Sequence, residues 1–281
     1  MPFTELFDET LDINSTENYE LSVEMSAHNL SFCILDGIRN KYIMFRSFVP
    51  EGQKKFTPDQ IREIISADDF LKKRYRKVHY VVSSPKFTLV PSALYDPGRK
   101  DEYFSFNYTV SDSSLILTDR IEDPDCFLLF AVSRPYAEVM KEFYPQSVPI
   151  HHLRPLFAQI HHERKSSTDN YIMAHIEADY FNLIIFGNNT LQLCNSFLYR
   201  NVSDILYHIL NVFRNMNIKQ EETIILSGQT DRFDDLSSNL AMFIRNVRYA
   251  SLLGNSTFSY VFNDIPFHRY INLFSAANCG S

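Results

Sequence analysis

Glycine is the residue that this sequence lacks most, with 7 in a chain of 281 residues against an average share of about 7% in proteins. Phosphate-binding loops are built from glycine, because their backbone amides must approach the anion closely and often at positive φ. The scarcity of glycine therefore makes nucleotide chemistry an unfavoured function from the outset.

Two further absences narrow the class of protein. The formal net charge is -7, so no global positive field attracts nucleic acid or an anionic membrane. No stretch approaches the roughly 18 consecutive apolar residues of a membrane-spanning helix. The first 20 residues are acidic and lack an apolar core run, so we expect no signal peptide and a cytoplasmic location.

The cysteines exclude two kinds of site. No two of them have the C-x-x-C spacing of a zinc ligand pair or redox motif, and their scatter is typical of buried or terminal thiols in a reducing compartment. The four are Cys33, Cys126, Cys194 and Cys279. We expect neither a disulfide framework nor a metal site.

Apolar residues are plentiful: 45% of the chain is hydrophobic, with 24 Phe and 16 Tyr, which supports sizeable cores. A chain of 281 residues is long enough for two domains. The polar stretch 163–169 is the best linker signal. We predict a flexible acidic leader (1–18), a first domain (19–165) with an insertion around 91–132, and a second domain (166–281).

The first half begins with alternating apolar and polar residues, which predict half-buried strands at 19–25, 30–34 and 41–48. Thr57 followed by Pro58 and, two residues later, Gln60 is typical of a helix start with a capping box. We expect this helix, either continuous or broken near Asp68, to end in the basic run 72–77. Strands follow at 78–83, 87–90, 114–118, 127–132 and 148–152, with a helix near 136–143.

The second half repeats this order. Strands are expected at 172–177, 181–186 and 191–197, then an amphipathic helix over 202–216. A buried strand at 223–226 precedes a helix that Asp231 caps, a strand at 247–252 and a helix near 267–274. Setting Leu21 against Ile172 keeps the first strands in step, and a shift of two residues brings Phe48 opposite Phe197. This pattern predicts an internal duplication.

Three strands in a meander, followed by alternating helix and strand, is the order of the ribonuclease-H-like unit. Two such units in tandem look like the actin, Hsp70 and sugar-kinase superfamily. The chain resembles an uncharacterised actin-like family of Bacteroidetes through the meander 20–48, the segment 87–91 (Phe-Thr-Leu-Val-Pro) and the segment 224–228 (Ile-Ile-Leu-Ser-Gly). The resemblance implies an α/β fold of two tandem ribonuclease-H-like units in an actin-like ATPase-type arrangement, each with a mixed sheet flanked by helices. It implies no particular activity.

In enzymes of that superfamily, the first hairpin of each domain carries an Asp-x-Gly type turn that handles phosphate and metal. Here the first hairpin, 25–29 (Met-Ser-Ala-His-Asn), has neither a carboxylate nor glycine. The second keeps Glu177 and Asp179, but Ala178 and Tyr180 occupy the space that a phosphate needs. The turn on the adenosine side keeps Ser227 and Gly228, with one glycine of the usual pair. A structural turn is the favoured interpretation of these four positions, and a residual nucleotide site is the alternative.

Other chemistries find little support. A two-metal nuclease needs clustered acids, and Asp204, Asp231, Asp234 and Asp235 are better explained as helix-start residues. The adjacent pairs His151-His152 and His161-His162 lack the i,i+4 spacing of helical metal ligands, so we expect surface or hinge histidines. No serine lies in a nucleophile elbow. We predict no catalytic residue, no metal and no cofactor.

The only basic cluster consists of Lys72, Lys73, Arg74, Arg76 and Lys77. At a helix C-terminus these cations offset the dipole, and the alternative is a surface for an acidic partner or RNA. The acidic leader is a further partner for this cluster, within the chain or from a second copy. Nucleic acid is the less favoured of these.

The fold survives while the phosphate loops do not, which favours a non-catalytic actin-like scaffold or adaptor with a protein or peptide partner. In kind it resembles the pilus-assembly and secretion proteins that use this fold to recruit peptide segments. A homodimer is left open. The alternative function is a weak ATP-binding or ATP-dependent enzyme that uses the cleft between the domains.

Overall fold

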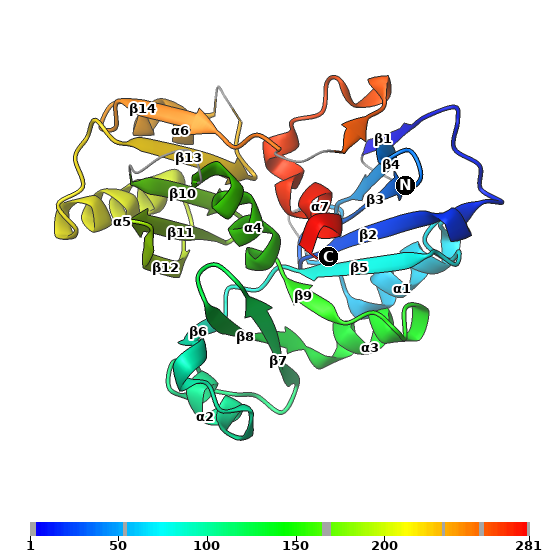
Figure 1. Ribbon diagram of the computed structural model, residues 1–281, viewed down its shortest axis with the longest axis horizontal. Helices are drawn as coiled ribbons and strands as arrows, with labels where there is room; N and C mark the ends of the chain where they lie inside the picture. The colour runs from blue at the N-terminus through cyan, green and yellow to red at the C-terminus, as the bar shows by residue number, and fades with distance from the viewer. Residues whose placement is uncertain (1–3, 53–54, 165–169, 232–233, 253–255, 280–281) are drawn as a thin grey trace. The chain divides into compact units, whose positions relative to one another are not determined.

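The computed structural model describes residues 4–52, 55–164, 170–231, 234–252 and 256–279. The chain forms two compact units, shown in Figure 1. Unit 1 comprises Met1–Ala158, Gly254–Ile265 and Asn272–Ser281, and unit 2 comprises Gln159–Leu253 and Pro266–Ile271. Segments near the C-terminus therefore belong to both units, and the predicted domain boundary at 165/166 stays a prediction.

The main sheet of unit 1 has the strand order β1-β4-β3-β2-β5-β9, with β15 pairing with β4. Its strands are β1 (Thr4–Phe7), β2 (Tyr19–Met25), β3 (Leu30–Asp36), β4 (Lys41–Phe48), β5 (Lys77–Val82), β9 (Pro149–His151) and β15 (Thr257–Phe258). β2, β3 and β4 form an antiparallel meander, and β5 and β9 join in parallel. Both faces are covered, since nearly every residue of β2 and β3 is buried.

Strand β1 is not predicted by the sequence pattern, because its four residues are too few to establish an alternation. It pairs antiparallel with β4, from Thr4 opposite Ser47 to Phe7 opposite Met44. Directly after it, the buried Asp8 accepts a hydrogen bond from Lys41 at 2.8 Å and another from Ser259. Part of the acidic N-terminal stretch is therefore built into unit 1.

Helix α1 (Pro58–Ala67) has the predicted capping box: Gln60 N donates to Thr57 Oγ1 at 3.2 Å, and Thr57 N donates to Gln60 Oε1 at 2.9 Å. Its continuation into residues 72–77 is wrong. Asp68 ends the helix because its carboxylate accepts from the backbone amides of Phe70 and Leu71 at 2.8 and 2.9 Å. The basic cluster consequently lies in the turn before β5 and at the start of that strand, not at a helix C-terminus.

A small three-stranded sheet, β6-β8-β7, lies between β5 and helix α3 (Arg134–Phe143) in sequence. It is made of β6 (Phe87–Pro91), β7 (Ser114–Ile121) and β8 (Cys126–Ser133), with α2 (Lys100–Ser105) beside it. Val90, Phe104, Ile116 and Leu129 form a core of its own. The extra strands expected in this region are therefore grouped into one subdomain.

After that subdomain, α3 (Arg134–Phe143) leads to β9 and then to α4 (Leu153–Arg164). A surface position is wrong for His151 and His152, because both side chains are fully buried. His151 bonds the Ser84 carbonyl through Nε2 at 2.9 Å, and its backbone amide donates to Asp119 at 2.7 Å. The predicted linker begins in the last turn of α4, and residues 165–169 lie outside the described residues.

The sheet of unit 2 has the order β12-β11-β10-β13-β14. Its strands are β10 (Tyr171–Ile176), β11 (Tyr180–Gly187), β12 (Thr190–Leu198), β13 (Thr223–Gly228) and β14 (Asn246–Tyr249). Helix α5 (Val202–Asn215) packs Ile205, Ile209 and Phe213 onto one face, as the predicted amphipathic pattern requires.

Helix α6 (Asp235–Leu240) also covers the core of unit 2 through Leu236 and Leu240. Its N-cap is Asp234, whose carboxylate accepts from Ser237 N at 2.7 Å. The assignment of Asp231 as the cap is therefore wrong by three residues. The C-terminal helix predicted at 267–274 is a 3-10 turn (Phe267–Tyr270) followed by α7 (Ile271–Ser275).

The main sheets of the two units share one strand order. β4-β3-β2-β5-β9 in unit 1 corresponds to β12-β11-β10-β13-β14 in unit 2. Both meanders carry a register shift at the same place, between Ile34 and Leu35 and between Ile185 and Phe186. The internal duplication stays a prediction, and this shared irregularity agrees with it.

Candidate functional site

The turn between β10 and β11 holds two of the residues of the alternative nucleotide site, Glu177 and Asp179. Its backbone is already used by the protein: Glu177 N donates to Tyr180 O at 2.9 Å, and Tyr199 N donates to Asp179 O at 3.2 Å. The Tyr199 hydroxyl also donates to Glu177 O. Since these groups stabilise the turn itself, they are not available to a phosphate.

Gly228 ends β13 with a φ of +81°. A Cβ atom at this position would lie 2.1 Å from the carbonyl oxygen of Ile176 in β10. Glycine is required here because two strands of one sheet approach each other closely, and because L side chains disfavour this φ. The close approach also leaves no open cradle at the Cα of Gly228 for an anion.

The three amides that follow Gly228 are all satisfied within unit 2. Gln229 N donates to Ile176 O at 2.7 Å, and Thr230 N donates to Gly228 O at 2.8 Å. Asp231 N donates to the Asp234 carboxylate at 2.8 Å. A nucleotide-binding turn presents free amides to its ligand, so this turn does not fit a bound phosphate as it stands.

Ser227 and Glu177 meet at a buried histidine that the sequence analysis does not single out. His175 Nδ1 lies 2.9 Å from Ser227 Oγ, and His175 Nε2 lies 3.4 Å from Glu177 Oε1. The residue types are those of a hydrolytic triad. The serine is 0% exposed, however, so no substrate reaches its hydroxyl. The arrangement joins β10 to β13 rather than forming a nucleophilic site.

The first hairpin of unit 1, between β2 and β3, also uses its own backbone amides in hydrogen bonds within the chain. Ser26 N donates to Asn29 O at 2.8 Å, and His28 N donates to Ser26 Oγ at 3.1 Å. Ala27 O accepts from Phe56 N at 2.9 Å. The turn has no carboxylate, and its amides at Ser26 and His28 are taken, so it offers neither a metal ligand nor a phosphate cradle.

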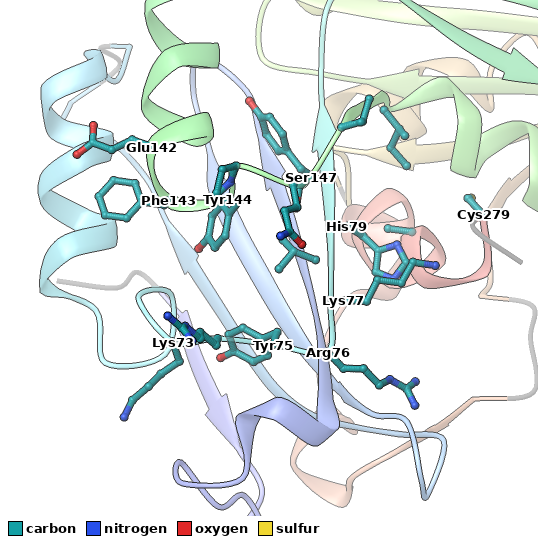
Figure 2. A pocket seen from close by; sticks show the side chains of 18 of the residues that line it. Lys73, Tyr75, Arg76, Lys77, His79, Glu142, Phe143, Tyr144, Ser147 and Cys279 are labelled. Carbon is teal, nitrogen blue, oxygen red and sulfur yellow. The ribbon is translucent and has the colours of Figure 1, made fainter.

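The predicted basic cluster lines a pocket in unit 1 with a volume of about 910 Å³. Figure 2 shows Lys73, Arg76 and Lys77 beside it, together with Tyr144 and Ser147 from the end of α3 and the loop that follows. Lys73, Arg74, Arg76 and Lys77 belong to the lining and Lys72 does not. Lys72 instead pairs with Asp69 at 3.0 Å.

Glu20, on neighbouring β2, partly balances this charge. Its carboxylate pairs with Arg76 and lies 2.9 Å from His79 Nε2. Burial acts to raise the pKa of Glu20, but the hydrogen bonds from His79 and Arg76 outweigh it and lower that pKa. Burial lowers the pKa of His79, so we expect the imidazole to be neutral at pH 7.

The structure thus separates the predicted site residues into two places. Glu177, Asp179, Ser227 and Gly228 meet at one end of the unit 2 sheet, and the basic residues gather at one edge of the unit 1 sheet. The sequence pattern misses the other wall of the basic pocket, 142–148, and the contribution of Arg154. No motif marks these residues, because they reach the pocket through the pairing of β9 with β5.

Among the described residues, no group of three or more His, Cys, Asp or Glu is arranged to hold a metal ion. None of the described helices is both long and apolar enough to cross a membrane.

Solved structures of known fold are similar to this chain. A Bacteroides thetaiotaomicron protein with actin-like ATPase fold and unknown function matches with a TM-score of 0.74 at 20% identity, over 86% of this chain and 94% of that one. A chain of the PilM–PilN type IV pilus biogenesis complex matches with a TM-score of 0.55 at 13% identity, over 92% and 96%. The predicted actin-like fold of mixed sheets flanked by helices is confirmed.

No curated protein matches this sequence. A family of unknown function matches residues 8–247, and the predicted resemblance to an uncharacterised actin-like family is confirmed with it. Because the match covers most of the chain, the protein belongs to the family described as "Protein of unknown function (DUF3822)".

Proposed function

We propose that this protein is a non-catalytic actin-like scaffold or adaptor that acts in the cytoplasm by binding another protein. The observation that carries the proposal is the state of the turn after β13. Gly228 is packed against Ile176, and the amides of Gln229, Thr230 and Asp231 all donate within the chain. An actin-like fold keeps its two-unit scaffold without these loops, and a scaffold serves binding as well as catalysis.

The similarity to a chain of the PilM–PilN complex supports the same proposal, since that protein of similar fold is solved in a complex of two proteins. The likeness is one of fold alone. The partner of this chain is therefore argued from its own surface below.

The alternative is weak ATP binding at Glu177, Asp179, Ser227 and Gly228. In its favour, Asp179 is only partly buried and lies in the turn after β10, near the end of β13. It requires the turn to open and release the amides that the chain now uses.

A thermal-shift titration with Mg-ATP distinguishes the two functions. A ligand that binds only the folded state raises the melting temperature in a saturable way. We expect no such rise and no release of phosphate. A saturable rise contradicts the scaffold proposal, and its loss in Glu177→Gln would assign the binding to this turn. Gly228 is unsuitable as a probe because any side chain there collides with Ile176.

A further inference from the structure

The pocket of unit 1 lies where β5 has a neighbouring strand on one side only. β2 pairs with all of β5, from Lys77 to Val82, whereas β9 pairs only with Tyr80–Val82. Within the described residues, no strand pairs with Val78 and His79 on the side of β9. An open strand edge presents main-chain donors and acceptors that another extended chain can use.

The lining of this pocket combines positive charge with apolar surface. The lining contains five Lys or Arg residues and one Glu, namely Lys73, Arg74, Arg76, Lys77, Arg154 and Glu142. Arg76 and Arg154 are paired with Glu20 and Asp119. Lys73 and Arg74 form no ion pair with a carboxylate of the described residues. Val148, on the opposite wall, is 74% exposed.

A buried hydroxyl in the same lining lacks a partner. Tyr80 is 2% exposed, and its hydroxyl makes no hydrogen bond with any described residue. Buried hydroxyls are nearly always satisfied by protein, water or a ligand. This unsatisfied group lies next to the open edge in β5, which points to a ligand with hydrogen-bonding groups at this pocket.

We propose that the pocket binds an extended acidic peptide segment of a partner protein, which adds as a short strand beside Val78 and His79. Its carboxylates face Lys73 and Arg74, its apolar side chains lie against Val148, and a polar atom satisfies Tyr80. The inference rests on the proposed scaffold function and names the chemistry of the partner. A small anion would use the cations alone and would leave the strand edge and the apolar wall without a role.

The acidic N-terminal stretch of the same chain does not fill this pocket. Glu5 pairs with Arg46 at 2.8 Å, and Asp8 pairs with Lys41 at 2.8 Å. Lys41 and Arg46 both belong to β4, and strands β3 and β2 lie between β4 and β5 in the sheet. These contacts hold Glu5 and Asp8 away from the pocket, so the proposed occupant is a segment of another molecule.

The probe is a fluorescein-labelled peptide in which Glu and Val alternate over about six residues, a usual strand length. Its binding to the full chain is followed by fluorescence polarisation. Comparison probes are a Lys–Val peptide, two Glu–Val peptides N-methylated along one edge or the other, and a single-stranded RNA oligonucleotide. The double variant Lys73→Glu/Arg74→Glu is matched by Lys219→Glu/Arg245→Glu, which makes the same charge change on exposed residues of unit 2.

We expect saturable binding of the Glu–Val peptide that weakens with salt. Reversal of Lys73 and Arg74 should weaken it about tenfold or more, the matched variant should retain it, and one N-methylated peptide should fail to bind. No saturable binding, equal binding by both N-methylated peptides, or equal affinities of the two double variants would overturn the proposal. Tighter binding of RNA than of the peptide, lost on reversing Lys73 and Arg74, would replace it with a nucleic-acid surface. Failure of the scaffold function is read separately, from the Mg-ATP titration.

Discussion

The main sheets of units 1 and 2 have the same strand order, and they differ at the end of β5 in unit 1 and of the corresponding β13 in unit 2. In unit 1, Ser83 N donates to Met25 O at 3.0 Å, and in unit 2, Gln229 N donates to Ile176 O at 2.7 Å. The hydrogen bond is the same, but the residue before the donor is Val82 in one unit and Gly228 in the other. Gly228 thus allows β13 to approach β10 closely at the position that Val82 takes in unit 1.

The edges of the two sheets differ as well. In unit 1, β1 covers β4, whereas the corresponding β12 of unit 2 has no further strand among the described residues. At the other edge, β14 pairs with β13 from its first residue, Thr223, whereas β9 pairs only with the last three residues of β5. One frame therefore carries an open, basic strand edge in unit 1 and a covered one in unit 2.

Gly228→Ala should cause the largest loss of stability, and it tests the difference between the ends of β5 and β13. The new Cβ would meet the Ile176 carbonyl oxygen at 2.1 Å, and the residue would keep a φ of +81°. Overpacking and backbone strain together should lower the free energy of unfolding by about 4 kcal/mol. Urea denaturation followed by circular dichroism measures this loss.

Gly52→Ala is the control for the backbone term alone. Gly52 has a φ of +59°, but a Cβ there has nothing within 4 Å. We expect a loss of about 1 kcal/mol. If Gly228→Ala costs no more than this control, the close approach of the strands is not what requires glycine.

These features show what the sequence predicts and what it does not. The meander strands and helices α1 and α5 were predictable, because apolar residues recur in their sequences with a period of two or of 3.6 and the helix caps are local. The burial of both faces of β2 and β3 was not, since their alternation predicts half-buried strands. The need for glycine at position 228 was not predictable, because it comes from a close approach to a backbone atom of Ile176, which is distant in the sequence. The strand at 148–152 was predicted, but the pocket depends on which residues of β5 it pairs with, and the sequence pattern does not encode that β9 pairs only with Tyr80–Val82. Position in the sheet, which no local pattern encodes, decides both sites.

Asp8→Asn tests how much the residue that follows β1 stabilises this edge of the unit 1 sheet, since Asp8 pairs with Lys41 of β4. Burial acts to raise the pKa of Asp8, but hydrogen bonds from Lys41 and Ser259 hold it well below its ordinary value. The variant loses the charge-assisted part of these bonds, which should cost about 2 kcal/mol of unfolding free energy at pH 7.

The same carboxylate gives this loss a pH dependence. A lowered folded pKa stabilises the protein above the unfolded value of about 3.9 and ceases to do so as the pH falls through the folded pKa. The difference between the parent and Asp8→Asn should therefore shrink on acidification from pH 5 toward pH 2 and stay constant above. A difference that grows on acidification would contradict the assigned interaction.

Ser227→Ala tests whether the contact between the buried His175 and Ser227 stabilises the fold. Ser227 Oγ lies 2.9 Å from His175 Nδ1, and its loss should lower the unfolding free energy by about 1 kcal/mol. Ser83, just past the matching strand end in unit 1, has a buried hydroxyl without a hydrogen-bond partner among the described residues. Ser83→Ala should therefore be close to neutral, and equal losses for the two variants would remove the special role of the His175–Ser227 bond.

The smallest effect concerns Tyr80, which lies opposite Val23 in β2, where unit 2 has Leu226 opposite Ala174. Because its buried hydroxyl lacks a partner, Tyr80→Phe should raise the unfolding free energy by about 0.5 kcal/mol. Tyr144→Phe is the control: its hydroxyl donates to Leu71 O at 2.7 Å, so its loss should cost about 1 kcal/mol.

The proposed peptide site adds a second readout, since Tyr80→Phe should weaken binding of the Glu–Val peptide while the protein becomes no less stable. A loss of stability equal to that of Tyr144→Phe would mean that the hydroxyl is already satisfied without a ligand.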